Sequence, residues 1–422
     1  HLCELVLIIY KMIQLLLICI SINDIQNKTF NIKCENKMIN STKKWIWEHG
    51  DYPNFPYDKD RIKEKLRKAE YLRGVLAGIL SLANKEDLDQ LEIASITDEI
   101  IGTSQIEGEY LRRESVKDSV ANAINSEYTS AEDKSTRHTD DLAEITLDSF
   151  RNNEPLTIER LHGWHNAIFA NTSGYDGIKK ITIGAFRDYD NMRVVENLFG
   201  REGKIVKYIA PPHRLIEKDI EALLNYCNTS DEEPYIKSAL AHLWFVSIHP
   251  YDDGNGRISR AIADYILSHD TQDEYKIYSM ATAIYAKRVE YYNTLDMTTD
   301  LHKNRHYDFT LWVEWNIDIL ISALERSHKN ILFIIKKTKF WDKYRKIKLT
   351  KKHIQFLDTF IDGLFKNKKN EFSNNDYRGV TGVSSVTASR HIKKMLECGC
   401  IRRIEGTAKR NASYTLLFDE DN

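Results

Sequence analysis

Twelve consecutive residues combine the groups that phosphoryl or nucleotidyl transfer needs. They read His-Pro-Tyr-Asp-Asp-Gly-Asn-Gly-Arg-Ile-Ser-Arg from His249 to Arg260. His249 can take a proton from an attacking hydroxyl, and Asp253 is a hard oxygen ligand of the kind that Mg²⁺ prefers beside phosphates. Arg257 lies three residues before Arg260, so on a helix the two guanidinium groups share a face and can clamp phosphate oxygens. The stretch therefore predicts a site that handles phosphates.

A helix must begin inside this stretch if the groups are to converge. Gly254 and Gly256 allow tight turns and a close approach of the backbone. A helix that begins near Asn255 points its unpaired N–H groups and the positive end of its dipole outward, which makes an anion site. The preceding residues, 234–248, have a strongly apolar side at helical spacing and lead directly into His249. We expect helix, loop and helix, with the reactive groups on the loop.

The composition is typical of a helical, globular chain. The 422 residues suffice for two to three domains, and 42% hydrophobic with 29% charged residues excludes a disordered chain and a polytopic membrane protein. Only 7 prolines and 18 glycines favour helix, because both residues break helices. A net charge of −2 argues against a protein that coats nucleic acid along its whole length. Six scattered cysteines make no disulfide framework, and we expect a cytoplasmic protein.

Taken singly, a histidine at a helix end, two arginines on a helix face and a glycine turn each have an ordinary structural explanation. Together they resemble the motif of the Fic (filamentation induced by cAMP) family, His-Pro-Phe-x-Asp/Glu-Gly-Asn-Gly-Arg-x-x-Arg. Tyr251 replaces the usual Phe; it keeps the aromatic ring and adds a hydroxyl that needs a partner. The resemblance extends over roughly 45–335. It implies a mainly α fold with a small β-hairpin flap, and transfer of AMP from ATP, with Mg²⁺, to a Ser, Thr or Tyr hydroxyl of a target protein.

The same resemblance implies a role for each residue of the motif. His249 is the general base, and Asp253 is the metal ligand. The backbone of the Gly-Asn-Gly turn, with Asn255, cradles the α-phosphate, and the two arginines bind the outer phosphates. A Tyr-Tyr pair downstream matches one that lines the adenine pocket in relatives; without the resemblance these tyrosines are core or interface aromatics. The residues expected to contact the nucleotide are Met192, Arg193, Val194, Val195, Asp253, Gly254, Asn255, Gly256, Arg257, Arg260, Tyr291 and Tyr292.

Residues 181–195 differ from their helical surroundings. They alternate apolar and polar residues around Arg187-Asp-Tyr-Asp-Asn191, which predicts a short β-hairpin. The segment resembles the Fic flap, whose edge aligns the target protein by strand addition. Residues 192–195 would then lie over the nucleotide.

A second motif suggests regulation. Residues 103–108, Thr-Ser-Gln-Ile-Glu-Gly, end a predicted helix with an apolar face. They resemble the Fic inhibitory motif, Ser/Thr-x-x-x-Glu-Gly/Asn, in which Glu107 would pair with Arg260 and so occupy the arginine that should hold the γ-phosphate. Because the motif precedes the core, inhibition would act within one chain. In some relatives the same glutamate supports removal of AMP, so the resemblance leaves de-AMPylation open as a second activity.

The chain after Arg345 has its own order of elements. Helices over 352–365, 374–379 and 384–397 precede a strand, a loop and a strand over 401–417, which is the order of a winged helix-turn-helix. Arg345–Leu417 holds 16 Lys plus Arg against 6 Asp plus Glu, a local excess of 10. DNA binding and protein docking both remain open for this unit. The expected DNA contacts are Ser384, Thr387, Arg390, Lys393 and Lys394 on the recognition-type helix, and Lys409, Arg410 and Asn411 in the wing.

The first residues have a foreign composition. From Leu5 to Ile20 the chain is almost wholly apolar, shorter than the roughly 20 residues that span a bilayer, and it lacks the cleavage site of a secretory signal. We expect Met38 to be the natural start, with a membrane anchor as the alternative. The expected division is a non-native or uncharacterised leader, an N-terminal helical domain with the inhibitory motif, a Fic catalytic core and a winged helix, over 1–37, 38–138, 139–335 and 345–418.

Two functions from different classes therefore remain. The first is an autoinhibited protein adenylyltransferase, and the second is a DNA-binding transcriptional regulator whose Fic core senses a nucleotide without turnover. The intact His249 favours the first, because a binding module has no need of a base. Another nucleotide or a phosphocholine donor is a third possibility, against which the two arginines favour ATP. Expected partners are the target protein, DNA and, because relatives often form dimers, a second copy; no membrane partner is indicated.

Overall fold

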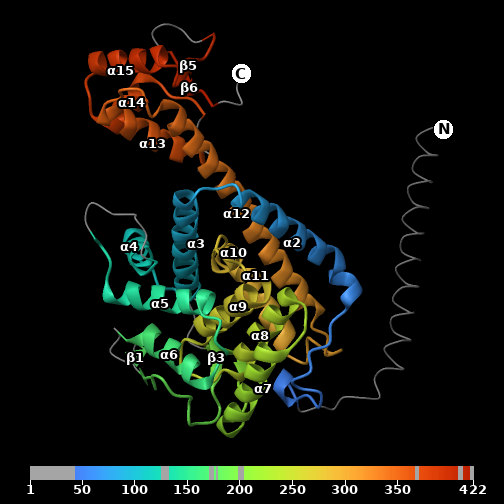
Figure 1. The fold of residues 1–422 in the computed structure, drawn as a ribbon. Helices are drawn as coiled ribbons and strands as arrows, with labels where there is room; N and C mark the ends of the chain where they lie inside the picture. Colours follow the sequence, from blue (N-terminus) through green and yellow to red (C-terminus); the bar gives the residue numbers. More distant parts are fainter. Residues whose placement is uncertain are drawn as a thin grey trace, which may run out of the picture.

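The computed structural model describes residues 43–124, 133–170, 175–176, 179–197, 204–365, 370–406 and 412–418. Figure 1 shows a helical body and a smaller C-terminal unit at the end of one long helix. The leader over 1–37, Met38 and the predicted wing contacts over 409–411 lie outside the described residues. Among the described helices, none is both long and apolar enough to cross a membrane.

The body consists of helices that begin where the sequence offers capping residues. Asn84 accepts a hydrogen bond from the backbone N–H of Asp87, and Thr157 accepts one from that of Arg160, as N-caps do. Most of these helices coincide with the apolar periodicity; one of them, over 113–123, was not predicted. The helices of the body are α2 (Lys59–Leu80), α3 (Lys85–Ile106), α4 (Arg113–Ala123), α5 (Arg137–Arg151), α6 (Ile158–Phe169), α7 (Ile216–Thr229), α8 (Pro234–Ile248), α9 (Asn255–Thr271), α10 (Met280–Ala286), α11 (Arg288–Thr299) and α12 (Thr310–Tyr344), with 3-10 turns η1 (Ile46–Glu48) and η2 (His213–Leu215).

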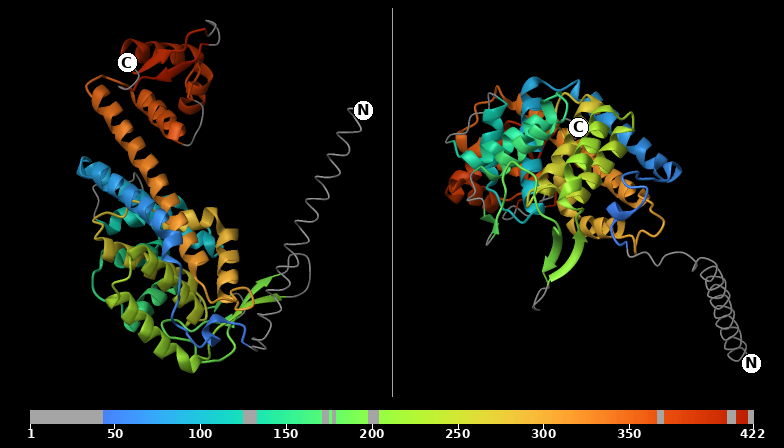
Figure 2. Two further views of the ribbon diagram at one scale, coloured as in Figure 1. Left: turned by 90° about the vertical axis from the view of Figure 1, so that its right-hand side faces the viewer. Right: turned by 90° about the horizontal axis from the view of Figure 1, so that it is seen from below.

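One hydrophobic core runs through the whole body. Its buried side chains extend from Ile46 to Ile331, so the expected boundary at 138/139 does not separate two cores. The N-terminal helix α2 lies along α12 (Figures 1 and 2). Three ion pairs, spaced one turn apart along α2, join the two helices: Arg61 with Glu314 at 2.6 Å, Lys65 with Asp318 at 2.7 Å and Lys68 with Glu325 at 2.7 Å. The N-terminal helices are therefore fixed against the core.

The small β-hairpin lies further along the chain than predicted. Strand β3 (Arg193–Asn197) pairs antiparallel with β4 (Lys204–Ile209), with Arg193 opposite Ile209, and Figure 2 shows the two strands projecting from the body. The expected hairpin over 181–195 is therefore wrong except at its last three residues. Residues 181–192 form no strand because their polar groups bind the loop after α8, as described below. Two further short strands, β1 (Tyr175–Asp176) and β2 (Lys179–Lys180), pair with each other.

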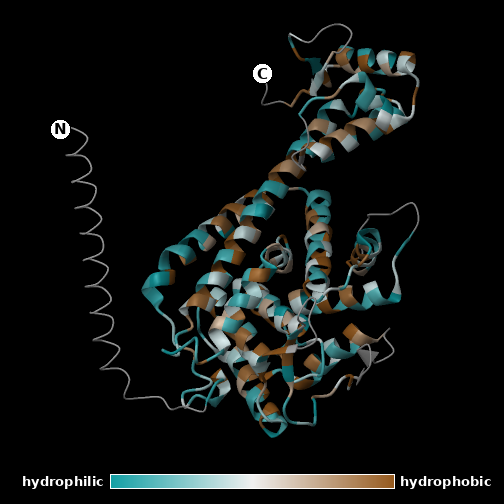
Figure 3. Cartoon of the chain, turned by 180° about the vertical axis from the view of Figure 1, so that it is seen from behind, coloured by the Kyte–Doolittle hydropathy of each residue, from teal (hydrophilic) through white to brown (hydrophobic). Residues whose placement is uncertain are grey.

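The long helix α12 continues beyond residue 335, where the expected Fic core ends. It spans 35 residues and ends at Tyr344 rather than near residue 335. Its last turns are basic but amphipathic: Phe340 and Tyr344 are buried in a second core. That core belongs to the C-terminal unit, α13 (Lys351–Phe365), α14 (Asn374–Thr381), α15 (Ser385–Glu397), β5 (Ile401–Arg403) and β6 (Tyr414–Leu416). The order of these elements is the predicted one. In Figure 3, apolar and polar residues alternate along the helices of both parts, as amphipathic packing requires.

Candidate active site

The predicted motif forms a tight loop between α8 and α9. His249 ends α8 in the left-handed region (φ 50°, ψ 58°), and Gly254 precedes α9 with φ 80°. A Cβ at Gly254 would collide with the ring of Phe169, so this position needs glycine. The side chain of Asn255 holds the loop together: its Oδ1 accepts from Tyr251 N at 3.0 Å and its Nδ2 donates to Tyr251 O at 2.8 Å. The side-chain amide of Asn255 is thus already hydrogen-bonded within the loop. Its expected contact with the nucleotide would therefore be made by its backbone N–H.

The ring of Tyr251 is packed beneath the loop. It is fully buried and stacks on His165 with ring centroids 4.1 Å apart. The extra hydroxyl, absent from the usual Phe, has a partner in His162 Nδ1 at 2.9 Å. His165 Nδ1 accepts from Gly184 N at 2.9 Å, which leaves Nε2–H to donate to Asp253 O at 3.1 Å. Burial lowers the pKa of His165 to about 4, so this bridge between two loops is made by a neutral ring.

His249 is placed and protonated as a general base requires. Its Nδ1 lies 3.3 Å from Val246 O. A carbonyl only accepts hydrogen bonds, so Nδ1 carries the proton and the lone pair of the neutral ring is on Nε2. Burial lowers the pKa of His249 to about 4, and the nearby charge of Arg187 acts in the same direction. At neutral pH the ring is therefore uncharged and can accept a proton.

Arg187, which sequence reasoning missed, fixes the backbone at His249. Its Nε donates to His249 O at 3.0 Å, its Nη1 to Tyr189 O at 2.7 Å and its Nη2 to Pro211 O at 2.6 Å. Its own N–H donates to Pro250 O at 2.9 Å. The guanidinium thus ties residues 187–189 and the start of η2 to the motif loop. Only its position in the polar centre of the predicted hairpin marked it in the sequence.

Asp252 makes a second tie to the same segment. Its Oδ1 accepts from the Tyr189 hydroxyl at 2.7 Å and its Oδ2 from Thr182 N at 2.9 Å. These bonds, with those of Arg187, use the polar groups of residues 182–189 that a strand ladder would need. The segment therefore braces the motif loop instead of forming the expected hairpin.

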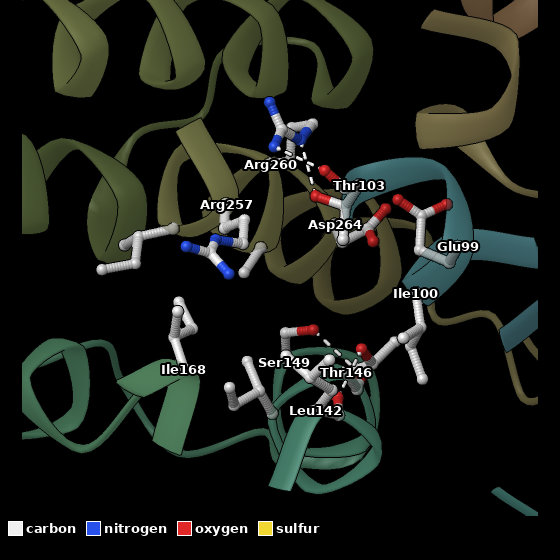
Figure 4. A pocket seen from close by; sticks show the side chains of 13 residues that line it. Glu99, Ile100, Thr103, Leu142, Thr146, Ser149, Ile168, Arg257, Arg260 and Asp264 are labelled. Carbon is white, nitrogen blue, oxygen red and sulfur yellow. Dashed lines mark hydrogen bonds between the residues drawn. The ribbon is translucent and has the colours of Figure 1, made fainter. Parts of the chain in front are cut away.

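The two arginines of α9 face an acidic segment at the end of α3. Arg260 Nη2 donates to Glu107 Oε1 at 2.6 Å, and Arg260 Nε donates to Thr103 Oγ1 at 2.7 Å, so the predicted pair of Glu107 and Arg260 is present. Arg260 itself is buried, at 4% exposure. Figure 4 shows Thr103 reaching Arg260, with Arg257 on the neighbouring turn, around a cavity of about 40 Å³ between α3, α5, α6 and α9.

The Glu107 carboxylate lies at the beginning of α9. A Cβ added to Gly256 would collide with Glu107 Oε1, so this glycine admits the carboxylate. The N-terminus of a helix is an anion site, because its first N–H groups have no partner within the helix. Glu107 therefore places a negative charge at this helix N-terminus.

A second acid, Glu109, pairs with the other arginine. Its Oε2 lies 3.4 Å from Arg257 Nη1, and its Oε1 lies 2.7 Å from His138 Nε2 on α5. The hydrogen bond with His138, together with the charge of Arg257, lowers the pKa of Glu109 despite its partial burial. Sequence reasoning missed this pair, although the spacing Glu107-Gly-Glu109 beside two arginines three residues apart is a usable signal. Both arginines of the motif are thus held by acids from one segment.

The flap residues and the tyrosine pair lie at different depths. Met192 and Val194 pack on a small cluster of Trp45, Tyr208 and Ala210, while Arg193 and Val195 are exposed. A nucleotide contact by these four residues stays a prediction.

Tyr291 is a core residue with 2% exposure, and its hydroxyl lies 3.0 Å from His242 Nε2. The structure thus matches the structural explanation of Tyr291 rather than an open adenine pocket. Tyr292 is 42% exposed and donates to Ile106 O at 3.3 Å, directly before Glu107. Of the expected pair, only Tyr292 reaches the surface beside the inhibitory segment.

The site has groups that fit a triphosphate and an ion. Arg257 Nε and Arg260 Nη1 are buried donors with no hydrogen-bond partner in the described part of the chain, which suits an anion. The Asp253 carboxylate accepts from Gly254 N at 2.6 Å, next to the start of α9. No group of three or more His, Cys, Asp or Glu side chains within the described residues could hold a metal alone. Mg²⁺ needs only one or two carboxylates when substrate phosphates complete its shell, so Asp253 fits.

Comparison with known proteins agrees with the motif. Residues 155–267 match the Fic/DOC family model, and residues 45–125 match a domain of unknown function, DUF4172. A Fic family protein from Desulfovibrio desulfuricans G20 has 19% identity and a TM-score of 0.49 over 86% of this chain and 98% of its own. A Fic domain containing signaling protein from Bacteroides thetaiotaomicron VPI-5482 has 19% identity and a TM-score of 0.44 over 66% and 96%. Fic-1 (residues 134–508) from C. elegans has 15% identity and a TM-score of 0.44 over 64% and 73%. At these identities and TM-scores, none of the three structures supports a conclusion about this chain's activity. Because the matched span 155–267 contains the complete motif from His249 to Arg260, the chain is a Fic family protein.

Proposed function

We propose that the protein transfers AMP from ATP to a Ser, Thr or Tyr hydroxyl of a target protein, and that the segment after α3 holds this activity off. Fic domains are transferases in general; the choice of an adenylyl group is the proposal. The observation that carries it is the neutral His249, with its lone pair on Nε2, beside α9, whose two arginines bind carboxylates. A site for nucleotide binding alone would need the arginines but not the base.

The chemistry requires few groups. The target hydroxyl oxygen attacks the α-phosphorus and forms the new O–P bond, while the bond to the α–β bridging oxygen breaks and pyrophosphate leaves. His249 Nε2 takes the hydroxyl proton. The first N–H groups of α9 face the α-phosphate, and Arg257 and Arg260 neutralise the outer phosphates. Asp253 would hold Mg²⁺, which, when bound, supplies further neutralisation of the phosphate charge.

Inhibition follows from the contacts of Arg260. Its Nε and Nη2 are both used by Thr103 and Glu107, and the Glu107 carboxylate stands at the helix end that the phosphates need. A nucleotide in the productive position must displace this carboxylate or bind against its negative charge. These contacts of Arg260 support the proposal that Glu107 inhibits transfer.

The test compares four full-length proteins: the parent, Glu107→Gly, His249→Ala and the double variant. Each is incubated with Mg²⁺ and ATP labelled at the α-phosphate, alone and with a lysate of the source cells. We expect label on protein with Glu107→Gly, little with the parent and none with the double variant. Absence of label with Glu107→Gly, on itself and on every added protein, rejects adenylyl transfer.

Two additions make the assay more specific. Other nucleoside triphosphates and a phosphocholine donor are offered in parallel, and a faster transfer from one of them rejects ATP as the donor. Labelled product from Glu107→Gly is then returned to the parent protein. Loss of label that requires both Glu107 and His249 would add de-AMPylation to the activity.

A further inference from the structure

We propose that the C-terminal unit, α13 to β6, binds duplex DNA by placing α15 in the major groove. The proposal does not depend on the transfer reaction, because it concerns a different part of the chain. Figure 1 places α15 at the end of the unit farthest from the helical body, so the body does not cover it. A helix of 13 residues is long enough to lie across a groove.

The helix pair α14–α15 is rigidly joined, as groove reading requires. Gly382 ends α14 with φ 71°, and the tight turn leads to Ser384, the N-cap of α15. The Tyr377 hydroxyl lies 2.9 Å from His391 Nδ1, and Asn374 Nδ2 donates to Ser389 Oγ at 2.9 Å. Two side-chain bonds therefore fix the angle between the helices. The inner face of α15 adds buried Ala388, Ile392 and Met395.

The outer face of α15 has the side chains of a DNA-reading surface. Small hydroxyl residues, Ser385 and Ser389, are exposed, and Arg390 and Lys393 follow them along the helix. Val386 is 82% exposed in the first turn, at helical spacing from both cations. An exposed valine has no packing role within this chain, whereas an apolar side chain in the major groove contacts the thymine methyl group. The face thus offers polar, apolar and cationic contacts in one row.

Two of the five side chains predicted to contact DNA also form the cap of α15, and their contact with DNA stays a prediction. The Ser384 hydroxyl donates to Thr387 Oγ1 at 3.0 Å and accepts from Thr387 N at 3.3 Å. Ser385, Val386 and Ser389 extend the exposed face, where the Ser385 and Ser389 hydroxyls also bond to Asn374. Arg390, Lys393 and Lys394 are exposed, and among the described residues Glu397 lies 3.9 Å from Lys393.

Further exposed cations lie on the same unit. Lys351 and Lys352 begin α13, Arg378 lies in α14, and Arg402 and Arg403 lie in β5. Phosphate contacts by such side chains hold a reading helix in register. The exposed cations therefore favour a polyanion as the partner. A protein surface fits less well, because the exposed apolar area of α15 consists of a single valine.

The first experiment measures affinity and its salt dependence. The full chain is titrated by fluorescence anisotropy against a random-sequence duplex of about 30 base pairs, between about 50 and 200 mM salt. Arg390→Gln combined with Lys393→Gln is compared with Lys63→Gln combined with Lys85→Gln, which removes the same charge from exposed positions on α2 and α3. We expect the α15 variant to bind roughly tenfold more weakly with a salt slope lower by about 2, and the control to match the parent.

The opposite results overturn the proposal. No binding by the parent at about 50 mM salt rejects DNA as the ligand. Equal weakening in both double variants shows a general charge effect without a role for α15. Unchanged DNA binding by the α15 variant, with an altered oligomeric state in sedimentation, makes α15 a protein-docking helix. Circular dichroism of each variant checks that the fold is intact.

A second experiment tests base reading. The parent selects duplexes from the random pool, and Val386→Ser is measured on the selected and the unselected DNA. We expect the substitution to weaken binding to selected DNA roughly fivefold or more and to leave the random pool unchanged, because a valine contributes nothing to phosphates. Failure to enrich any sequence, or an equal loss on both DNAs, rejects groove reading by α15.

Discussion

The two regions proposed to bind anions hold their cations in opposite ways. In the Fic motif, Arg260 is buried and Arg257 nearly so, and each contacts an acid from the segment after α3. On α15, Arg390, Lys393 and Lys394 are exposed, with one distant acidic neighbour among them. Paired, buried arginines make a site that an internal group can close. Exposed cations make a surface on which a bound anion competes only with the ions of the salt.

The largest expected effect is the loss of the base in the opened site. In the Glu107→Gly background, His249→Ala should lower the rate of adenylyl transfer by roughly 10²–10⁴-fold, the usual contribution of a general base. The rate is measured as label incorporated at saturating ATP. His249→Asn is the matched variant of similar size. A loss of less than about tenfold in both variants would contradict the role of His249 as base.

The pH profile follows from the same histidine. Burial and Arg187 lower the pKa of His249 to about 4, and Glu107 opposes them. Removing Glu107 should lower the pKa of His249 further. The neutral ring is the base, so the Glu107→Gly rate should stay level from neutral pH down to about pH 5 and fall only as the pH drops through the pKa. A midpoint near 6.5, the ordinary value for histidine, would show that the ring is solvated during turnover.

Removal of the inhibitory charge should have the next largest effect. Glu107→Gln keeps the size of the side chain and removes its charge, so Arg260 loses its ion pair, keeps only a hydrogen bond to a neutral amide, and the phosphates gain access. We expect more than tenfold faster transfer than with the parent. Glu107→Asp, which keeps the charge on a shorter chain, is the control and should stay nearer the parent. Equal rates for Glu107→Gln and the parent would mean that shape, not charge, closes the site.

Substitution of Glu109 tests whether one acid or two acids inhibit the site. Its contact with Arg257 is longer, at 3.4 Å, and Glu109 is 34% exposed, so solvent weakens it. Glu109→Gln alone should raise the rate only about two- to fivefold, and in the Glu107→Gln background its effect should differ, because the two acids act on one nucleotide. The readout is KM for ATP together with kcat. Strictly additive effects would separate Glu109 from the inhibition.

Local residue patterns revealed groups that act next to each other in the chain, whereas the one contact predicted across it, Glu107 with Arg260, came from the family resemblance. The end of α8 at His249, the start of α9 at Asn255 and the cap at Thr157 follow from local glycine, apolar and hydroxyl signals. The contacts of Arg187 with His249 and of Glu109 with His138 and Arg257 were missed, because these partners lie 62, 29 and 148 residues apart and no local pattern encodes such contacts.

Two errors of secondary structure have clear physical causes. The hairpin was placed too early because residues 181–192 alternate like a strand, yet their polar groups bind the motif loop through Arg187 and Asp252. The strand pattern of Lys204–Ile209 was the better signal. The expected core also ended too early, at residue 335, because α12 continues through the basic run that follows, to Tyr344. Lysine is a good helix former, and Phe340 with Tyr344 gives the extension an apolar face.

The smallest expected effect is that of a substitution in one region on the activity of the other. Arg390→Gln with Lys393→Gln, placed in the Glu107→Gly protein, should leave label transfer within about twofold, while Glu107→Gly should leave DNA affinity within the same limit. The reason is distance and rigidity: the two cation sets belong to different hydrophobic cores, joined through α12. Autolabelling and duplex anisotropy are measured on the same preparations. If DNA changes the transfer rate by more than about tenfold, α12 couples the regions, and the exposed cations become part of the control of the buried ones.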